Sequence, residues 1–175
     1  MTRFWGLAGF GILLALLMLP AVSSAQDVIK LGDYDDWTAF SAGAGADKVC
    51  YVVSQPKAQK PPTPERQAYV YLAHRPGKKA YNVVMVYAGY PYAAGSAVKI
   101  EIGRREFELF THRETAWAGD AKTDDDLERA MRLGREMIVR STPVDGPAST
   151  DTYSLAGIAK AVDRISLACP RDRRR

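Results

Sequence analysis

The sequence has little of the residues that carry most metal and nucleophilic chemistry. It contains only two cysteines and two histidines among 175 residues. Two cysteines without neighbouring histidines fall short of the four ligands of a structural zinc site. A Gly-x-Ser-x-Gly elbow and a glycine-rich phosphate loop are also missing from the sequence. These absences exclude the enzymes recognised by such motifs, and we expect neither a metal nor a cofactor.

Long apolar runs are also scarce, and the one that exists lies at the beginning. Arg3 precedes an apolar stretch, Phe4 to Leu19, and small residues up to Ala25 separate it from polar Gln26. This is the layout of a secretory signal peptide, so we expect cleavage between Ala25 and Gln26. An uncleaved anchor is the alternative, but the run is shorter than the ~20 residues of a spanning helix. The remainder predicts a single domain over 26–170 and a tail over 171–175.

Apart from Arg3 in the signal-like segment, the excess of positive charge is confined to this tail. The formal net charge is +4, and the stretch 26–170 has equal numbers of basic and acidic residues. The tail arginines are Arg171, Arg173, Arg174 and Arg175. A balanced domain argues against a nucleic-acid partner. The tail is interpreted as a solvated terminus, with peripheral contact to an anionic membrane surface as the alternative.

The cysteines, Cys50 and Cys169, are an even pair in a chain that carries an export signal. Exported proteins meet an oxidising compartment, where such a pair favours a disulfide. The alternative is two buried free thiols. A bridge would close a loop of about 120 residues, for which the chain-entropy model gives nearly 5 kcal/mol as an upper value.

Strand-like runs dominate the middle of the chain. The stretches 49–54, 68–74 and 81–88 are rich in valine and tyrosine and are apolar at both alternating sets of positions. They predict central strands that are covered on both faces. The proline-rich stretch 55–64 predicts an extended surface loop.

The best hairpin candidate joins 98–102 to 105–110 through Gly103 and Arg104. In this register five apolar side chains share one face, and charged side chains take the other. The five are Val98, Ile100, Ile102, Phe107 and Leu109. Glycine at the first turn position suits a type II′ turn.

Two helices are also expected. The first begins at a cap formed by Thr123 and the acidic residues 124–126, and it ends at Gly134. The second begins near Ser154, and its apolar residues recur at helical spacing on one face. They are Leu155, Ile158, Val162, Ile165 and Cys169. A disulfide from Cys169 would therefore tether this C-terminal helix to a central strand.

Several segments together resemble the invasion-associated locus B family of exported bacterial proteins, from about Trp37 to Cys169. They are Val49-Cys50-Tyr51, Gly89-Tyr90-Pro91-Tyr92, Phe107-Glu108-Leu109-Phe110, Ala116-Trp117-Ala118, Ala130-Met131-Arg132-Leu133-Gly134, Met137-Ile138-Val139 and Thr150-Asp151-Thr152-Tyr153-Ser154-Leu155-Ala156-Gly157. The resemblance implies a mainly β fold, an immunoglobulin-like β-sandwich with two short helices. It also implies a periplasmic, outer-envelope or secreted location in a Gram-negative bacterium and a theme of host-cell invasion. The chain departs from the family in having Asp145-Gly146-Pro147 where relatives tend to carry an Arg-Gly-Thr-like turn.

Candidate site residues are few. His74 and His112 lack the motif context of a catalytic base and are interpreted as structural or exposed. Tyr90, Tyr92 and Trp117 form the candidate recognition surface, because such side chains bury area while keeping a polar tip. Packing at a corner of the sandwich is the alternative for these aromatic residues.

These features predict a non-enzymatic envelope or secreted binding module, whose partner is a protein or a glycan at the cell envelope. The alternatives are a periplasmic structural or homeostasis protein without a host role, and a hydrolase of unrecognised type that uses His74 or His112.

Overall fold

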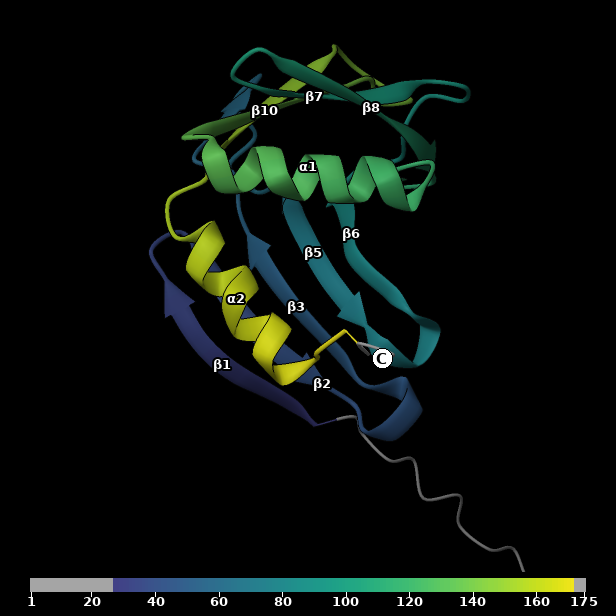
Figure 1. Cartoon of the computed structure of the whole chain (residues 1–175). Helices are drawn as coiled ribbons and strands as arrows, with labels where there is room; N and C mark the ends of the chain where they lie inside the picture. Colours follow the sequence, from purple (N-terminus) through teal and green to yellow (C-terminus); the bar gives the residue numbers. More distant parts are fainter. Residues whose placement is uncertain (1–26, 172–175) are drawn as a thin grey trace, which may run out of the picture.

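The computed structural model describes residues 27–171, which form eleven β-strands, two α-helices and two short 3-10 helices (Figure 1). The strands are β1 (Val28–Tyr34), β2 (Trp37–Ala42), β3 (Val49–Ser54), β4 (Ala58–Lys60), β5 (Tyr69–Arg75), β6 (Ala80–Tyr87), β7 (Ala97–Ile102), β8 (Arg105–His112), β9 (Thr115–Trp117), β10 (Glu136–Ser141) and β11 (Ser149–Ser154). The helices are η1 (Gly45–Asp47), η2 (Pro76–Lys78), α1 (Ala121–Leu133) and α2 (Ile158–Ala168).

All strands join one antiparallel sheet in the order β1-β2-β3-β5-β6-β9-β8-β7-β10-β11-β4. The short β9 connects the two halves, because it pairs with β6 on one side and with β8 on the other. In Figure 1, α2 lies across β1, β2 and β3, and α1 lies between β5–β6 and the strands β7, β8 and β10. Both halves and both helices contribute to one buried core, as the halves of a β-sandwich do. The predicted mainly β fold with two helices is confirmed.

The hairpin of β7 and β8 has the predicted register. Ile102 pairs with Arg105, Ile100 with Phe107, and Val98 with Leu109. All five apolar side chains of the predicted face are buried. Gly103 has a φ of 60°. A type II′ turn requires a positive φ at this position, and glycine adopts it readily because it has no side chain.

The central strands are buried on one face, not on both. In β3, Cys50, Val52 and Ser54 are buried, whereas Val49, Tyr51 and Val53 are half-buried. Both helices pack on the face that holds the buried residues, and no helix among residues 27–171 covers the other. The expectation of two covered faces was therefore wrong, because the apolar residues at the alternate positions face outward.

Helix α1 begins earlier than predicted, and its acidic run has a different role. The N-cap is Asp120, whose carboxylate accepts hydrogen bonds from the backbone N–H and the hydroxyl of Thr123. Asp124 is buried and accepts a hydrogen bond from the backbone N–H of Val84 at 2.9 Å. The helix ends at Gly134, as predicted.

Helix α2 begins later than predicted. Ser154 belongs to β11, where it pairs with Glu136, and its carbonyl accepts a hydrogen bond from the Trp37 indole at 3.0 Å. The N-cap is Gly157, whose φ is 88° and where a Cβ would lie 2.0 Å from the carbonyl oxygen of Tyr34. The predicted apolar face is nevertheless correct, because all five of its residues are buried.

The stretch 55–64, predicted as a loop from its proline content, contains one short strand, β4. Residues of β4 pair with Thr150, Asp151 and Thr152 of β11 and so form the last strand of the sheet. Prolines at positions 56 and 61 flank this three-residue strand, which keeps it short and at the edge.

Candidate binding surface

The uncovered face of the sheet carries a row of half-buried aromatic rings. Phe40 stacks on Tyr51 with ring centroids 5.3 Å apart, and Tyr51 is 6.1 Å from Tyr71. The row continues from Tyr71 to Tyr69 at 5.9 Å and from Tyr69 to Tyr87 at 6.3 Å. We call these five residues the open aromatic face. They come from β2, β3, β5 and β6, because alternate residues of neighbouring antiparallel strands point to the same side.

A cavity of about 210 Å³ adjoins the open aromatic face. Its lining is mainly apolar and comes from β3, β5, β6 and β9: Val49, Tyr51, Tyr71, Ala73, Arg75, Val83, Met85 and Trp117. Trp117 pairs with Met85 of β6 in the sheet, and its indole N–H donates to the Thr115 hydroxyl at 3.0 Å. We call this hollow the Trp117 cavity.

Arg75 is the charged residue in the lining of the Trp117 cavity. Its Nε is buried and has no hydrogen-bond acceptor among residues 27–171. No carboxylate of that part of the chain forms an ion pair with its guanidinium. The guanidinium is therefore a positive charge without a carboxylate partner in a mainly apolar lining, and this charge favours an anionic group in the cavity.

The hydroxyls of the two tyrosines in the cavity lining stay neutral at physiological pH. Burial raises the pKa of both Tyr51 and Tyr71 above the usual value of a phenol. They can therefore donate hydrogen bonds to a ligand at neutral pH.

The three aromatic residues of the predicted recognition surface lie in two different places. Trp117 lines the cavity of the open face, whereas Tyr92 is only 7% exposed and belongs to the core. The Tyr90 ring meets Tyr92 edge-on at 5.8 Å, and its hydroxyl lies 2.6 Å from that of Ser141. These contacts favour corner packing, the alternative interpretation, for Tyr90 and Tyr92. Recognition by the three residues stays a prediction.

Beside Tyr90 lies a buried ion pair between Arg66 and Asp151. Their side chains are only 6% and 3% exposed, and the Arg66 guanidinium makes two hydrogen bonds to the carboxylate. Arg66 also donates to the carbonyl of Ala88 at 2.7 Å, and its guanidinium lies over the Tyr90 ring. The pair joins the segment before β5 to β11 and has a structural role.

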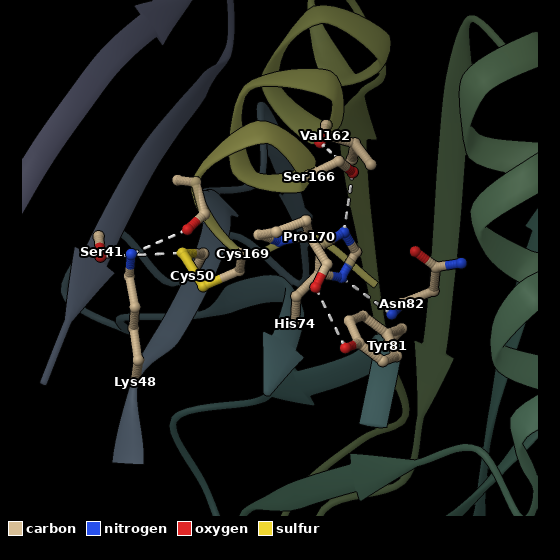
Figure 2. Close-up of a disulfide and its surroundings, with 11 residues drawn as sticks. Ser41, Lys48, Cys50, His74, Tyr81, Asn82, Val162, Ser166, Cys169 and Pro170 are labelled. Atoms are coloured by element: carbon tan, nitrogen blue, oxygen red, sulfur yellow. Dashed lines mark hydrogen bonds between the residues drawn. A yellow bond between two sulfur atoms is a disulfide. The ribbon is translucent and has the colours of Figure 1, made fainter. Parts of the chain in front are cut away.

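His74 is buried at the base of a cavity of about 730 Å³ between the helices and the sheet. Its Nδ1 accepts a hydrogen bond from the backbone N–H of Asn82 at 3.1 Å, so the neutral ring carries its proton on Nε2 (Figure 2). That nitrogen lies 3.0 Å from the Ser166 hydroxyl, which donates to the carbonyl of Val162 at 2.8 Å. Neither ring nitrogen is then available to take a proton from Ser166. Burial also lowers the pKa of His74.

The second histidine, His112, is exposed at the end of β8. Its carbonyl accepts a hydrogen bond from the Thr115 hydroxyl. Within residues 27–171, no group of three or more His, Cys, Asp and Glu side chains is placed to hold a metal ion.

Cys50 and Cys169 form the predicted disulfide, with their Cα atoms 5.9 Å apart (Figure 2). The bond attaches the end of α2 to β3 across 119 residues of sequence. The Lys48 ammonium adds a second link, because it donates to the carbonyl of Ala168 at 2.8 Å.

Comparison with known proteins identifies the family. The family model described as invasion associated locus B (IalB) protein matches residues 37–166. The chain belongs to the IalB family. The solved structure of invasion associated protein b from Bartonella henselae is similar to this IalB chain, with a TM-score of 0.56 and 14% sequence identity. The match covers 80% of this chain and 97% of the Bartonella chain, and at this identity it shows the shared fold. No curated protein matches the sequence.

Two sets of predicted residues of this IalB protein fall at or beyond the ends of the described range. Arg171 pairs with Asp125 at 2.9 Å, and its guanidinium lies over the Tyr81 ring. The cleavage residues Ala25 and Gln26 and the arginines 173–175 lie outside the described residues. None of the helices within 27–171 has the length and apolar character needed to cross a bilayer.

Sequence reasoning missed the open aromatic face of the IalB domain. The apolar neighbours of Tyr51, Tyr69 and Tyr71 favoured strands covered on both sides. The residue type could have indicated this face. One set of alternate positions in these strands is rich in tyrosine, whose hydroxyl can remain in contact with water. Arg75 at the end of β5 gave no signal in the sequence at all.

Proposed function

We propose that this IalB-family protein is an exported, non-enzymatic binding module of the bacterial envelope or its surroundings. Its partner is a protein or a glycan of the envelope, bound on the open aromatic face. The single observation that carries the proposal is that Phe40, Tyr51, Tyr69, Tyr71 and Tyr87 form a continuous, uncovered aromatic row. Large contiguous exposed apolar patches are uncommon on monomers and often mark interaction sites.

Tyrosine-rich surfaces are suited to recognition. Each ring contributes contact area with few rotatable bonds, so little conformational entropy is lost on binding. The rings already support one another, since every neighbouring pair in the row lies within 6.3 Å. Such a surface needs little reorganisation when a partner binds, which favours affinity.

Export is supported by the signal-peptide layout before Gln26 and by the Cys50–Cys169 disulfide. Disulfides persist in oxidising compartments such as the periplasm and are rare in the reducing cytosol. The test is the N-terminal sequence of the native protein, which should begin at Gln26. Native material that begins at Met1 would contradict export with cleavage.

The non-enzymatic assignment is supported by the hydrogen bonds of His74. A base for Ser166 would need a free ring nitrogen, and both nitrogens are engaged. The test replaces His74 and His112 together by glutamine. Unchanged partner binding by the folded double variant supports the assignment, and loss of a hydrolytic activity in it would favour the hydrolase alternative.

A role in host-cell invasion is the finer part of the proposal. Its support is membership of the IalB family and the structural similarity to a Bartonella protein that is named as invasion associated. A homeostatic envelope protein is the alternative. A deletion strain that enters host cells normally but shows an altered envelope would favour that alternative.

The binding function is tested by capture from envelope extract with the purified chain. Tyr51→Ser with Tyr71→Ser should abolish capture of the partner, because two central rings of the row are lost. The matched control is Leu133→Ser, which removes an apolar side chain that is 83% exposed at the end of α1. Unchanged capture by the folded tyrosine double variant would refute a binding role for this face.

A further inference from the structure

We propose that the Trp117 cavity binds the C-terminal residue of a partner polypeptide, with an apolar side chain inside the cavity and the α-carboxylate on Arg75. The inference rests on the proposed binding function and specifies the class of partner. It assigns a role to Arg75, to Trp117 and to the hollow between them.

The cavity selects an apolar group of limited size. Its volume of about 210 Å³ is below the range of roughly 300–1,000 Å³ typical of sites for whole drug-sized ligands. It therefore suits one side chain. Val49, Val83 and Met85 supply aliphatic walls, and Trp117 supplies an aromatic one, so an aromatic or branched side chain would fill it.

Arg75 makes the cavity favour a negatively charged group. Its guanidinium lines the cavity and has no carboxylate partner within residues 27–171. A carboxylate satisfies an arginine with two parallel hydrogen bonds, a geometry that no neutral amide reproduces. Exposed Lys78 and Lys79 follow within four residues, in the turn after β5, and add positive charge to the same end of the strand. The site is thus complementary to an anion joined to an apolar group.

A polypeptide fits better than a free small acid because the aromatic surface extends well beyond the cavity. The row runs from Tyr71 through Tyr69 to Tyr87, and on the other side through Tyr51 to Phe40. Residues that precede the terminal one can pack along this row. The strands β3 and β5 are paired on both sides, and β6 is paired with β9 at Met85, Val86 and Tyr87. A chain that follows the aromatic row must therefore lie on the face of these strands and cannot join them there as a further strand.

The test uses the purified chain and a synthetic peptide of glycine and serine residues that ends in phenylalanine. Binding is measured by calorimetry, and the site is located by the NMR resonance of the Trp117 indole N–H. The peptide with a free carboxylate should bind and shift that resonance. Its C-terminal amide should bind roughly tenfold to hundredfold more weakly, as expected when a hydrogen bond to a charged group is lost.

Two arginine variants define the anion contact. Arg75→Gln should reduce the affinity for the carboxylate peptide to that of the amide, and it should leave the affinity for the amide unchanged. Arg140→Gln is the matched control, because Arg140 is an exposed arginine that pairs with Glu101 on the other half of the sheet. It should leave both affinities unchanged.

Four outcomes overturn the proposal: no binding of the carboxylate peptide, equal affinity for acid and amide, equal affinity of wild type and Arg75→Gln, or binding of N-acetylphenylalanine as tight as that of the peptide. A self-association that is abolished by Trp117→Ser would also overturn it and would make a second copy the occupant. If the peptides fail while Tyr51→Ser with Tyr71→Ser still abolishes partner capture, the chain-end proposal fails and the binding function stands. If that double variant captures its partner normally, the binding function itself fails.

Discussion

Asp124 of α1 accepts a hydrogen bond from the backbone N–H of Val84, the residue of β6 at which pairing with β9 has stopped. The carboxylate takes the place of a neighbouring strand, and it fixes the helix to the edge of β6 by one defined contact. The adjacent Asp125 strengthens the junction, because it accepts a hydrogen bond from the Asn82 amide at 2.7 Å.

Replacing Asp124 tests this junction. Asp124→Ala should lower the free energy of unfolding by about 1–3 kcal/mol, since it leaves the buried Val84 N–H without an acceptor. Asp124→Asn retains an acceptor oxygen and should be markedly more stable than the alanine variant in urea denaturation. Equal stability of the two variants would contradict the assigned role.

Asp124 should also make the free energy of unfolding depend on pH. Burial raises the pKa of the Asp124 carboxyl to about 6 from an ordinary value near 3.8. The folded protein therefore holds this proton at pH values where the unfolded chain has released it, and the contribution of Asp124 to stability falls as the pH rises from 4 to 6. In Asp124→Asn this component should be missing. The measurement is the difference in unfolding free energy between wild type and variant across that range.

His74 predicts a dependence of opposite sign. Burial lowers its pKa, and the charges of Arg171 and Arg132 act in the same direction, while that of Glu128 opposes them. The unfolded chain therefore binds a proton more readily near pH 6.5, and stability falls as the pH drops below that value. A proton on Nδ1 would also break the bond from the Asn82 N–H. His74→Gln should remove this acid-side loss, and an unchanged loss in the variant would contradict it.

The disulfide should contribute strongly to the stability of the fold. Replacing Cys50 and Cys169 together by serine should lower the free energy of unfolding by about 3–5 kcal/mol, because the bridge closes a long loop in the unfolded chain. Wild-type protein reduced with dithiothreitol is the control and should unfold at the same urea concentration as the variant. Free thiols in the native protein, detected by mass spectrometry, would contradict the argument.

The buried Arg66–Asp151 pair should behave as a coupled unit. Arg66→Met alone should cost about 3–5 kcal/mol, because it leaves the Asp151 carboxylate buried and unpaired. Arg66→Met with Asp151→Leu should restore much of that loss, since apolar residues replace both charges. A double-mutant cycle by urea denaturation measures the coupling, and additive effects would show that the pair does not act as one unit.

Peripheral contact with an anionic membrane is the alternative to a solvated terminus for the basic tail, and it can be tested. Arg171 is held by Asp125 and lies over the Tyr81 ring, so contact with lipid would fall to Arg173, Arg174 and Arg175. Deleting 172–175 should weaken sedimentation with phosphatidylglycerol vesicles at low salt, by about 1 kcal/mol for each arginine near the surface. Wild-type binding that is insensitive to the deletion would leave the tail without this role.

Local pattern alone determined much of the architecture. The register of the β7–β8 hairpin followed from alternation around Gly103, and the buried face of α2 followed from the spacing that ends at Cys169. Both depend on residues close in sequence, for which strand and helix periodicity relate position directly to face. The disulfide followed from an even cysteine count together with an export signal.

Only the tertiary structure decided which surfaces stay open. Valine and tyrosine at alternate positions indicate that a strand is apolar. They do not indicate whether a second layer of the fold covers that strand. The placement of both helices on one side of the sheet leaves Tyr51 and Tyr71 uncovered. The pairing of β6 with β5 and with β9 brings Arg75 and Trp117, which are 42 positions apart in the sequence, to the same cavity. The tertiary structure also buries Tyr92. It gives Asp124, which was predicted as part of a helix cap, a hydrogen bond to the backbone of β6. These outcomes depend on contacts between distant segments, and sequence periodicity contains no information about such contacts.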